Sequence, residues 1–69
     1  MFDIGDRVRV SRGSWRRNPP LEVGIVEDIE YEGDGQYSLN VSFPNSPDDT
    51  FEESELEHAP KFTHPRLLK

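Results

Sequence analysis

The sequence predicts a small all-β domain built from five short strands, and three observations lead to this prediction. Apolar and polar residues alternate with a period of two along several short segments, as they do in strands with one buried face. Clusters of Gly, Pro, Asn, Asp and Ser separate these segments and predict turns. No segment carries the apolar spacing of a helix of useful length.

The first predicted strand covers residues 6–11, where two valines point to one face and two arginines to the other. Residues 12–22 do not alternate, and two consecutive prolines within them cannot lie inside a paired strand. We therefore expect a long first loop. It carries the only tryptophan of the chain, Trp15, together with three arginines.

The second and third predicted strands, residues 23–31 and 36–43, form a hairpin around the turn at residues 32–35. The turn has the sequence Glu-Gly-Asp-Gly, whose glycines adopt positive φ without steric cost. Val26 lies on the other face from the remaining apolar residues of its strand, and Asp28 is out of phase for a regular strand, so we expect a bulge or strong bend nearby, with Gly24 at a sharp bend. The alternation in the third strand predicts four core residues: Tyr37, Leu39, Val41 and Phe43.

The remaining predicted elements are short. In chain order they are a polar turn over 44–48, a fourth strand over 50–52, a 3₁₀ turn over 53–55 and a last strand over 56–58. Five strands in so short a chain suit a closed barrel, because closure removes exposed strand edges. We therefore expect one domain over residues 1–58. Residues 59–69, with two prolines, are predicted to be a flexible tail that is partly disordered or packed on the barrel.

Four segments carry a pattern that extends beyond strand periodicity: residues 5–10 (GDRVRV), 24–26 (GIV), 37–43 (YSLNVSF) and 51–56 (FEESEL). This pattern resembles the SH3-like barrel superfamily. Within it, the chain is similar to small photosynthetic accessory subunits of the PsaE and NDH ferredoxin-docking type, and to KOW-type and mind-bomb-type repeats. The resemblance covers residues 4–58. It implies a five-stranded SH3-like barrel, and the likeness to accessory subunits implies docking within a larger complex.

The composition argues against several classes of protein. The chain has no cysteine, which excludes a disulfide framework, thiol catalysis and zinc–thiolate sites. No apolar run has the length of a membrane span, and the N-terminus lacks the features of a signal peptide, so we expect a cytoplasmic protein. No catalytic motif, phosphate-binding loop or metal-ligand spacing is present. We therefore expect no enzyme activity, no cofactor, no metal and no small-molecule substrate.

Charge is segregated along the chain. The net charge is −6, made up of +3 over residues 1–17, −12 over residues 22–57 and +3 over residues 61–69. Such segregation predicts two electrostatic faces. A solvated surface that keeps a small domain soluble accounts for the same pattern, and the sequence leaves both interpretations open.

Two groups of residues are candidates for binding a partner. The first is the arginine- and tryptophan-rich loop, because Trp and Arg are enriched at interface hot spots; its members are Trp15, Arg16 and Arg17, supported by Arg12 and Arg9. In the alternative interpretation, Trp15 folds back and caps the core. The second group is an acidic docking patch for a basic surface, or else a solvated acidic face; it comprises Asp48, Asp49, Glu52, Glu53 and Glu55.

These features predict a protein–protein interaction module, acting as a small accessory or regulatory subunit of a larger complex. One alternative is a nucleic-acid or ribosome-linked module of the KOW type, in which the loop stacks on bases and contacts phosphates. A second is an acidic, phage-like inhibitor of a nucleic-acid-binding protein, whose acidic surface mimics a polyanion.

Overall fold

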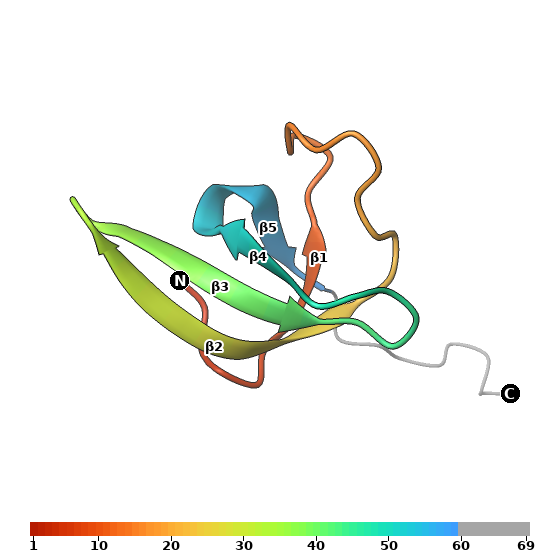
Figure 1. Cartoon of the computed structure of the whole chain (residues 1–69), viewed down its shortest axis with the longest axis horizontal. Coiled ribbons are helices and arrows are strands. Elements are labelled where there is room, and N and C mark those ends of the chain that lie inside the picture. Colours follow the sequence, from red (N-terminus) through yellow and green to blue (C-terminus); the bar gives the residue numbers. More distant parts are fainter. Residues whose placement is uncertain (60–69) are drawn as a thin grey trace, which may run out of the picture.

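The computed structural model describes residues 1–59 of the chain. This part contains five antiparallel strands, one 3₁₀ turn and the loops that connect them (Figure 1). The elements are β1 (Arg7–Val10), β2 (Gly24–Gly33), β3 (Gln36–Ser42), β4 (Asp49–Glu52), η1 (Glu53–Glu55) and β5 (Leu56–His58). They form a single sheet in the order β4-β3-β2-β1-β5. The all-β prediction is confirmed, and each strand lies where the alternation placed it to within one or two residues. The predicted tail lies outside the described residues, apart from Ala59.

The β2–β3 hairpin is the largest unit of the sheet, and its tip turns through three residues with positive φ. These are Gly33 at 99°, Asp34 at 55° and Gly35 at 74°. Glycine adopts such angles freely, and Asp tolerates them better than most residues, which explains why this turn forms here. The register shifts between Val26 and Asp28, so the predicted bulge is confirmed.

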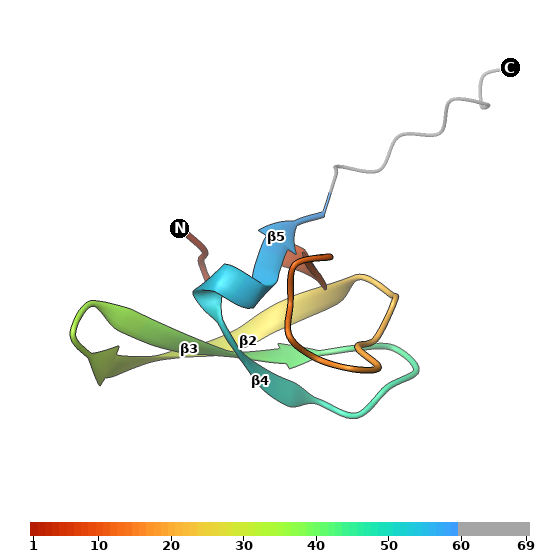
Figure 2. The ribbon, with the colours of Figure 1, turned by 90° about the horizontal axis from the view of Figure 1, so that it is seen from above.

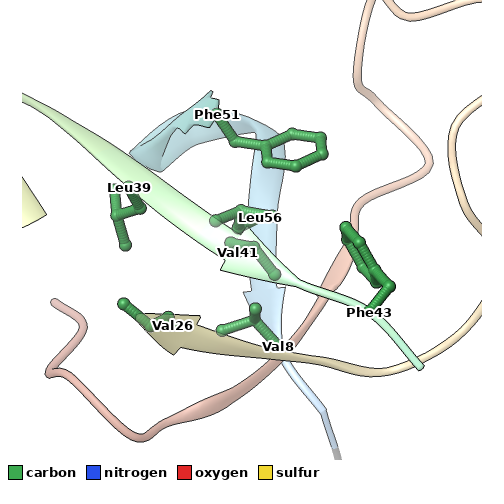
Figure 3. Packing of buried hydrophobic residues seen from close by; sticks show 7 residues of the cluster. All are labelled: Val8, Val26, Leu39, Val41, Phe43, Phe51 and Leu56. Carbon is green, nitrogen blue, oxygen red and sulfur yellow. The ribbon is translucent and has the colours of Figure 1, made fainter. Parts of the chain in front are cut away.

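Seven residues form the buried core, and they come from all five strands and the segment after β3 (Figure 3). They are Val8, Val26, Leu39, Val41, Phe43, Phe51 and Leu56. Three of the four core residues predicted in the third strand are buried, and Tyr37 packs against the cluster while remaining partly exposed. The bulge explains how Val26 and Ile29, three positions apart, both face the core, which a regular period of two would not allow.

The closed barrel that we predicted is not formed by main-chain pairing. Strands β4 and β5 lie at the two ends of the strand order, and no ladder joins them within residues 1–59. The two views show the chain turning at η1 between β4 and β5 (Figures 1 and 2). Because η1 directs β5 toward β1, β4 pairs with β3 alone and keeps an outer edge.

Among the described residues, no helix is long and apolar enough to cross a membrane.

Candidate functional site

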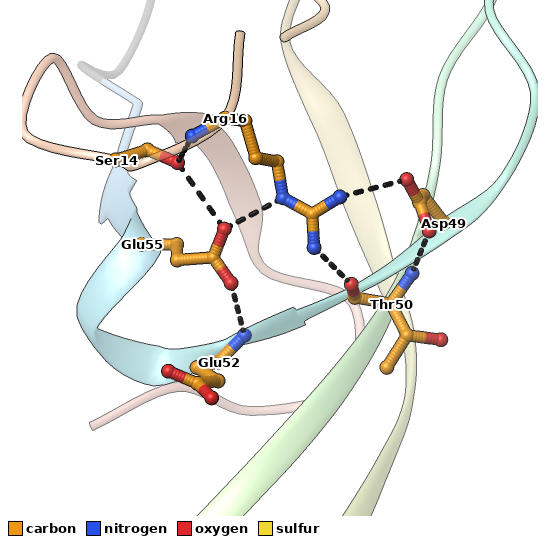
Figure 4. Close-up of polar contacts among 6 residues, drawn as sticks. All are labelled: Ser14, Arg16, Asp49, Thr50, Glu52 and Glu55. Carbon is orange, nitrogen blue, oxygen red and sulfur yellow. Dashed lines mark hydrogen bonds and ion pairs between the residues drawn. The ribbon is translucent and has the colours of Figure 1, made fainter.

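The first loop, residues 11–23, is held against the edge of the sheet by the side chain of Arg16 (Figure 4). The Arg16 guanidinium donates from Nε to Glu55 Oε1 at 2.6 Å, from Nη1 to Asp49 Oδ2 at 3.0 Å and from Nη2 to the Thr50 carbonyl at 2.7 Å. Its planar fork thus contacts β4 and η1 at once, a geometry that lysine could not reproduce. The contact to the Thr50 carbonyl satisfies one backbone acceptor of β4.

Glu55 is the buried partner in this cluster, with only 2% of its surface exposed. Besides Arg16, it accepts hydrogen bonds from the Ser14 hydroxyl at 3.2 Å and from the Glu52 amide at 3.0 Å. Burial alone would raise the pKa of Glu55, but the hydrogen bonds from Arg16, Glu52 and Ser14 hold that pKa below its ordinary value of 4.5. The carboxylate is therefore ionised and fully paired inside the protein.

Arg16 also lies between two aromatic rings. Its Cζ atom is 4.2 Å from the centroid of Phe51 and 4.9 Å from the centroid of Trp15. Stacking of this kind attracts the guanidinium to the ring faces and orients the rings. Phe51 is buried in the core, whereas Trp15 is 74% exposed. Trp15 therefore does not cap the core; it lies on the outer side of the arginine, presented to solvent.

The structure separates the five predicted partner-binding residues by environment. Arg16 is engaged within the chain. Arg9, in β1, is exposed but pairs with Glu57 on the neighbouring strand at 2.5 Å. Arg12, Trp15 and Arg17 are exposed. Among residues 1–59, no salt bridge involves Arg12 or Arg17. The surface that a partner could reach is thus smaller than the sequence predicted.

The predicted acidic patch is also divided. Asp48, Asp49 and Glu52 are exposed and Glu53 is half-buried, but Glu55 is buried and unavailable to a partner. Asp49 is shared with Arg16. Sequence reasoning assigned Glu55 to the surface because it lies in an acidic run. It also missed Ser14 and the Thr50 carbonyl, since no local pattern signals that they meet the loop.

The two arms of the first loop enclose an open groove of about 660 Å³ beside β1 and β5. Arg9 and Arg12 line it, together with Pro20 and Leu21 from the far arm. Glu57, the ion-pair partner of Arg9, also lines the groove, and Leu21, 96% exposed, adds an apolar group. Among the described residues, no three His, Asp or Glu side chains gather in a way that could hold a metal ion.

Comparison with known proteins gives no matching family model, no matching curated protein and no matching solved structure.

Proposed function

We propose that this protein is a protein–protein interaction module that binds its partner through the exposed face of the first loop. Trp15 is the apolar anchor, and Arg12 and Arg17 provide charged contacts. The observation that carries this proposal is a tryptophan with 74% of its surface exposed, on a loop fixed to the sheet by a buried ion pair. Such exposure of a large apolar side chain has an energetic cost that a partner would remove.

Preorganisation supports the assignment. A partner that binds a mobile loop loses affinity because the loop must be ordered, whereas a loop that is already fixed avoids this cost. Arg16 and Glu55 hold the backbone on either side of Trp15, since the Arg16 amide also donates to the Ser14 hydroxyl at 3.2 Å. Arg16 is thus a positioning residue for Trp15 and not itself a contact.

The charge of the loop indicates the chemistry of the partner. Arg12 and Arg17 flank Trp15 on a protein whose net charge is −6, so they form a local cationic surface. Arginine pairs well with carboxylates, and we therefore propose an acidic, partly apolar protein surface as the partner. Nucleic acid is the competing ligand for the same Trp and Arg side chains, but the acidic remainder of the molecule would repel a long polyanion.

Membership of the SH3-like superfamily belongs to the same proposal. The order β4-β3-β2-β1-β5, the long first loop and the short 3₁₀ turn before the last strand are compatible with that fold. Small domains of this kind commonly serve as binding modules, and we propose an accessory or regulatory subunit of a larger assembly.

The test uses Trp15 as its own reporter, because it is the only tryptophan in the chain. Tagged protein is used to capture partners from its native lysate with and without nuclease, and the captured protein is then titrated onto the purified chain. We expect the partner to survive nuclease and to shift Trp15 emission to the blue. In calorimetric titrations, which do not need the Trp15 reporter, Trp15→Ala should weaken binding by about 2 kcal/mol or more, roughly 30-fold, as hot-spot truncations do.

Ile4→Ala is the matched control, because Ile4 is 64% exposed but lies outside the loop; this variant should bind normally. Equal losses from both variants, or no loss from Trp15→Ala, would contradict the proposal. Capture that disappears on nuclease treatment would show instead that the loop binds nucleic acid.

A further inference from the structure

Strand β2 has an outer edge with few main-chain partners, and its Ile29 amide donates to the Asp28 carboxylate at 3.0 Å. Strand β1 pairs with β2 only opposite Gly24 and Ile25, and two further main-chain bonds join Val26 to Gly5 and Asp6. Within residues 1–59, no main-chain hydrogen bond from another segment reaches β2 beyond Val26 on the side away from β3. The uncovered edge runs over residues 27–33, about 23 Å at roughly 3.3 Å per residue. Figure 1 shows this half of the hairpin projecting beyond β1 and β5.

The register of the hairpin fixes which side chains flank this edge on each face. Ile29 lies opposite buried Leu39, and Tyr31 lies opposite Tyr37, so these two β2 side chains are on the core side of the sheet. The β2 residues between and beside them have the opposite orientation. Asp28 and Glu30 lie opposite Asn40 and Ser38, on the outer face. An added strand would therefore meet carboxylates on one face and apolar or aromatic groups on the other.

Charge around the edge has a single sign. All charged side chains between residues 27 and 34 are acidic: Glu27, Asp28, Glu30, Glu32 and Asp34. No lysine or arginine occurs anywhere in residues 22–57. A second copy of the chain would place carboxylates against carboxylates, which costs free energy across paired strands. A strand with lysines or arginines at the facing positions would instead gain attraction at each pair.

Both ends of the edge carry side-chain contacts. At the tip, the Gly35 amide donates to the Tyr31 hydroxyl at 3.0 Å, and the Tyr31 ring lies 5.0 Å from that of Tyr37. At the other end, the Ser42 hydroxyl donates to Glu27 at 2.8 Å. Tyr31 nevertheless remains 59% exposed. The edge thus combines side chains held by these contacts with an accessible aromatic group.

We propose that the edge of β2 over residues 27–33 binds an extended basic segment of a partner protein as an additional antiparallel or parallel strand. The segment carries lysine or arginine at alternate positions, facing Asp28 and Glu30, with apolar or aromatic residues between them, facing Ile29 and Tyr31. Main-chain hydrogen bonds supply affinity in this mode, and the alternating side chains supply specificity. This surface is separate from the first loop, so the inference does not rest on the function proposed above.

Acidic side chains also protect a strand edge from self-association, and a charged edge can serve that purpose alone. The difference between protection and docking lies in the backbone. If the edge is a docking site, its amides and carbonyls form hydrogen bonds with the partner, which replaces the Asp28 carboxylate at the Ile29 amide. If the charges are only protective, a basic peptide binds by charge without ordered pairing.

The experiment uses a synthetic peptide of about eight residues in which Lys and Val alternate, titrated onto the full chain and followed by amide hydrogen exchange. We expect slower exchange at alternate amides between Asp28 and Glu32, and no new protection in the first loop. A peptide with the same residues, methylated on the alternate amides that face the edge, keeps its charge but loses two or more hydrogen bonds. It should bind about 10-fold more weakly, because the bonds it loses contribute net affinity.

Two variants distinguish binding at the β2 edge from attraction by the net charge of the protein. Glu30→Lys should abolish binding of the alternating peptide, whereas Asp48→Lys makes the same change of charge in the loop between β3 and β4 and should leave most of the affinity. Trp15→Ala should bind the peptide normally, so failure of the loop proposal would not affect this result. Equal affinity for the methylated peptide, protection outside residues 27–33, or no binding of the unmodified peptide would each overturn the inference.

Discussion

Arg16 and Arg17 are adjacent in the sequence but have different environments. The Arg16 side chain is only 20% exposed and bonds to Glu55, Asp49 and Thr50, whereas Arg17 is exposed. Their roles follow from these environments. A guanidinium paired with a buried carboxylate holds the structure in place, and an exposed one is available to a partner. At the residue scale, the loop therefore combines one positioning arginine with two candidate contacts.

The buried carboxylate leads to the first prediction at this scale. Glu55→Gln removes the negative charge that pairs with Arg16 and should destabilise the fold by about 1–3 kcal/mol, because a charged donor loses its partner. Trp15 should also gain mobility, which lowers its fluorescence anisotropy. Urea unfolding measures the first effect, and Glu53→Gln, two residues earlier in η1 and outside the Arg16 cluster, is the control. Equal stability of the two variants would show that the ion pair makes no net contribution to the free energy of unfolding.

A second prediction concerns pH. Despite its burial, Glu55 has a pKa held below its ordinary value by Arg16, and the pKa of Glu22 is lowered by the Ser46 hydroxyl. A carboxyl group whose pKa is lower in the folded state stabilises that state above its unfolded pKa. The contribution is lost as pH falls through the folded-state pKa. The free energy of unfolding should therefore decrease below about pH 4.5, more steeply for the wild type than for Glu55→Gln.

At the element scale, β2 depends on a glycine at its first position. A Cβ atom on Gly24 would lie 2.5 Å from Val41 Cγ1, 2.7 Å from Phe43 Cε1 and 2.7 Å from the Ser42 carbonyl oxygen. Side-chain movement cannot relieve the last of these contacts, because it involves the backbone. The start of β2 therefore packs so closely on the end of β3 that only glycine fits, and this packing sets the register of the hairpin.

Gly24→Ala should consequently destabilise the fold by about 1–3 kcal/mol or more through overpacking. Gly13→Ala is the matched control, since a Cβ there would meet only the Ser11 hydroxyl at 3.7 Å. Thermal unfolding followed by circular dichroism compares the two. Unfolding of Gly24→Ala at the wild-type temperature would show that β2 and β3 can separate at this point without cost.

At the scale of the whole molecule, stability depends on a core of seven residues. A chain of this length typically has a total stability of roughly 3–10 kcal/mol. Leu39, in the middle of β3, is fully buried and lies between the register partners Ile29 and Phe51. A single truncation there removes a large share of the total.

Leu39→Ala should cost about 2–5 kcal/mol, and we expect a substantial unfolded population in the absence of denaturant. The amide NMR spectrum at physiological temperature provides the measurement. Ile4→Ala, at an exposed apolar position, should retain the wild-type spectrum. A fully folded Leu39→Ala variant would mean that the core is larger than the seven buried residues.

The sequence by itself determined the strands, the turns and most of the core. Alternation in β3 predicted Leu39, Val41 and Phe43 as core residues, and the Gly-Asp-Gly turn predicted the hairpin, because both are local effects of side-chain period and backbone freedom. The change of phase at Val26 predicted the bulge for the same reason. Partner class, enzyme activity and cellular location stay predictions.

Only the tertiary structure decided which charged side chains are paired and whether the sheet closes into a barrel. The sequence placed Arg16 among the binding residues and Glu55 in an acidic patch. In the structure these two residues, 39 positions apart in the chain, form one ion pair beneath the first loop. The sheet has an uncovered β2 edge and open ends at β4 and β5 because strand length and the path of η1 determine where pairing stops. Local patterns specify which residues favour burial, whereas the contacts between distant segments determine which charges are paired and which face solvent.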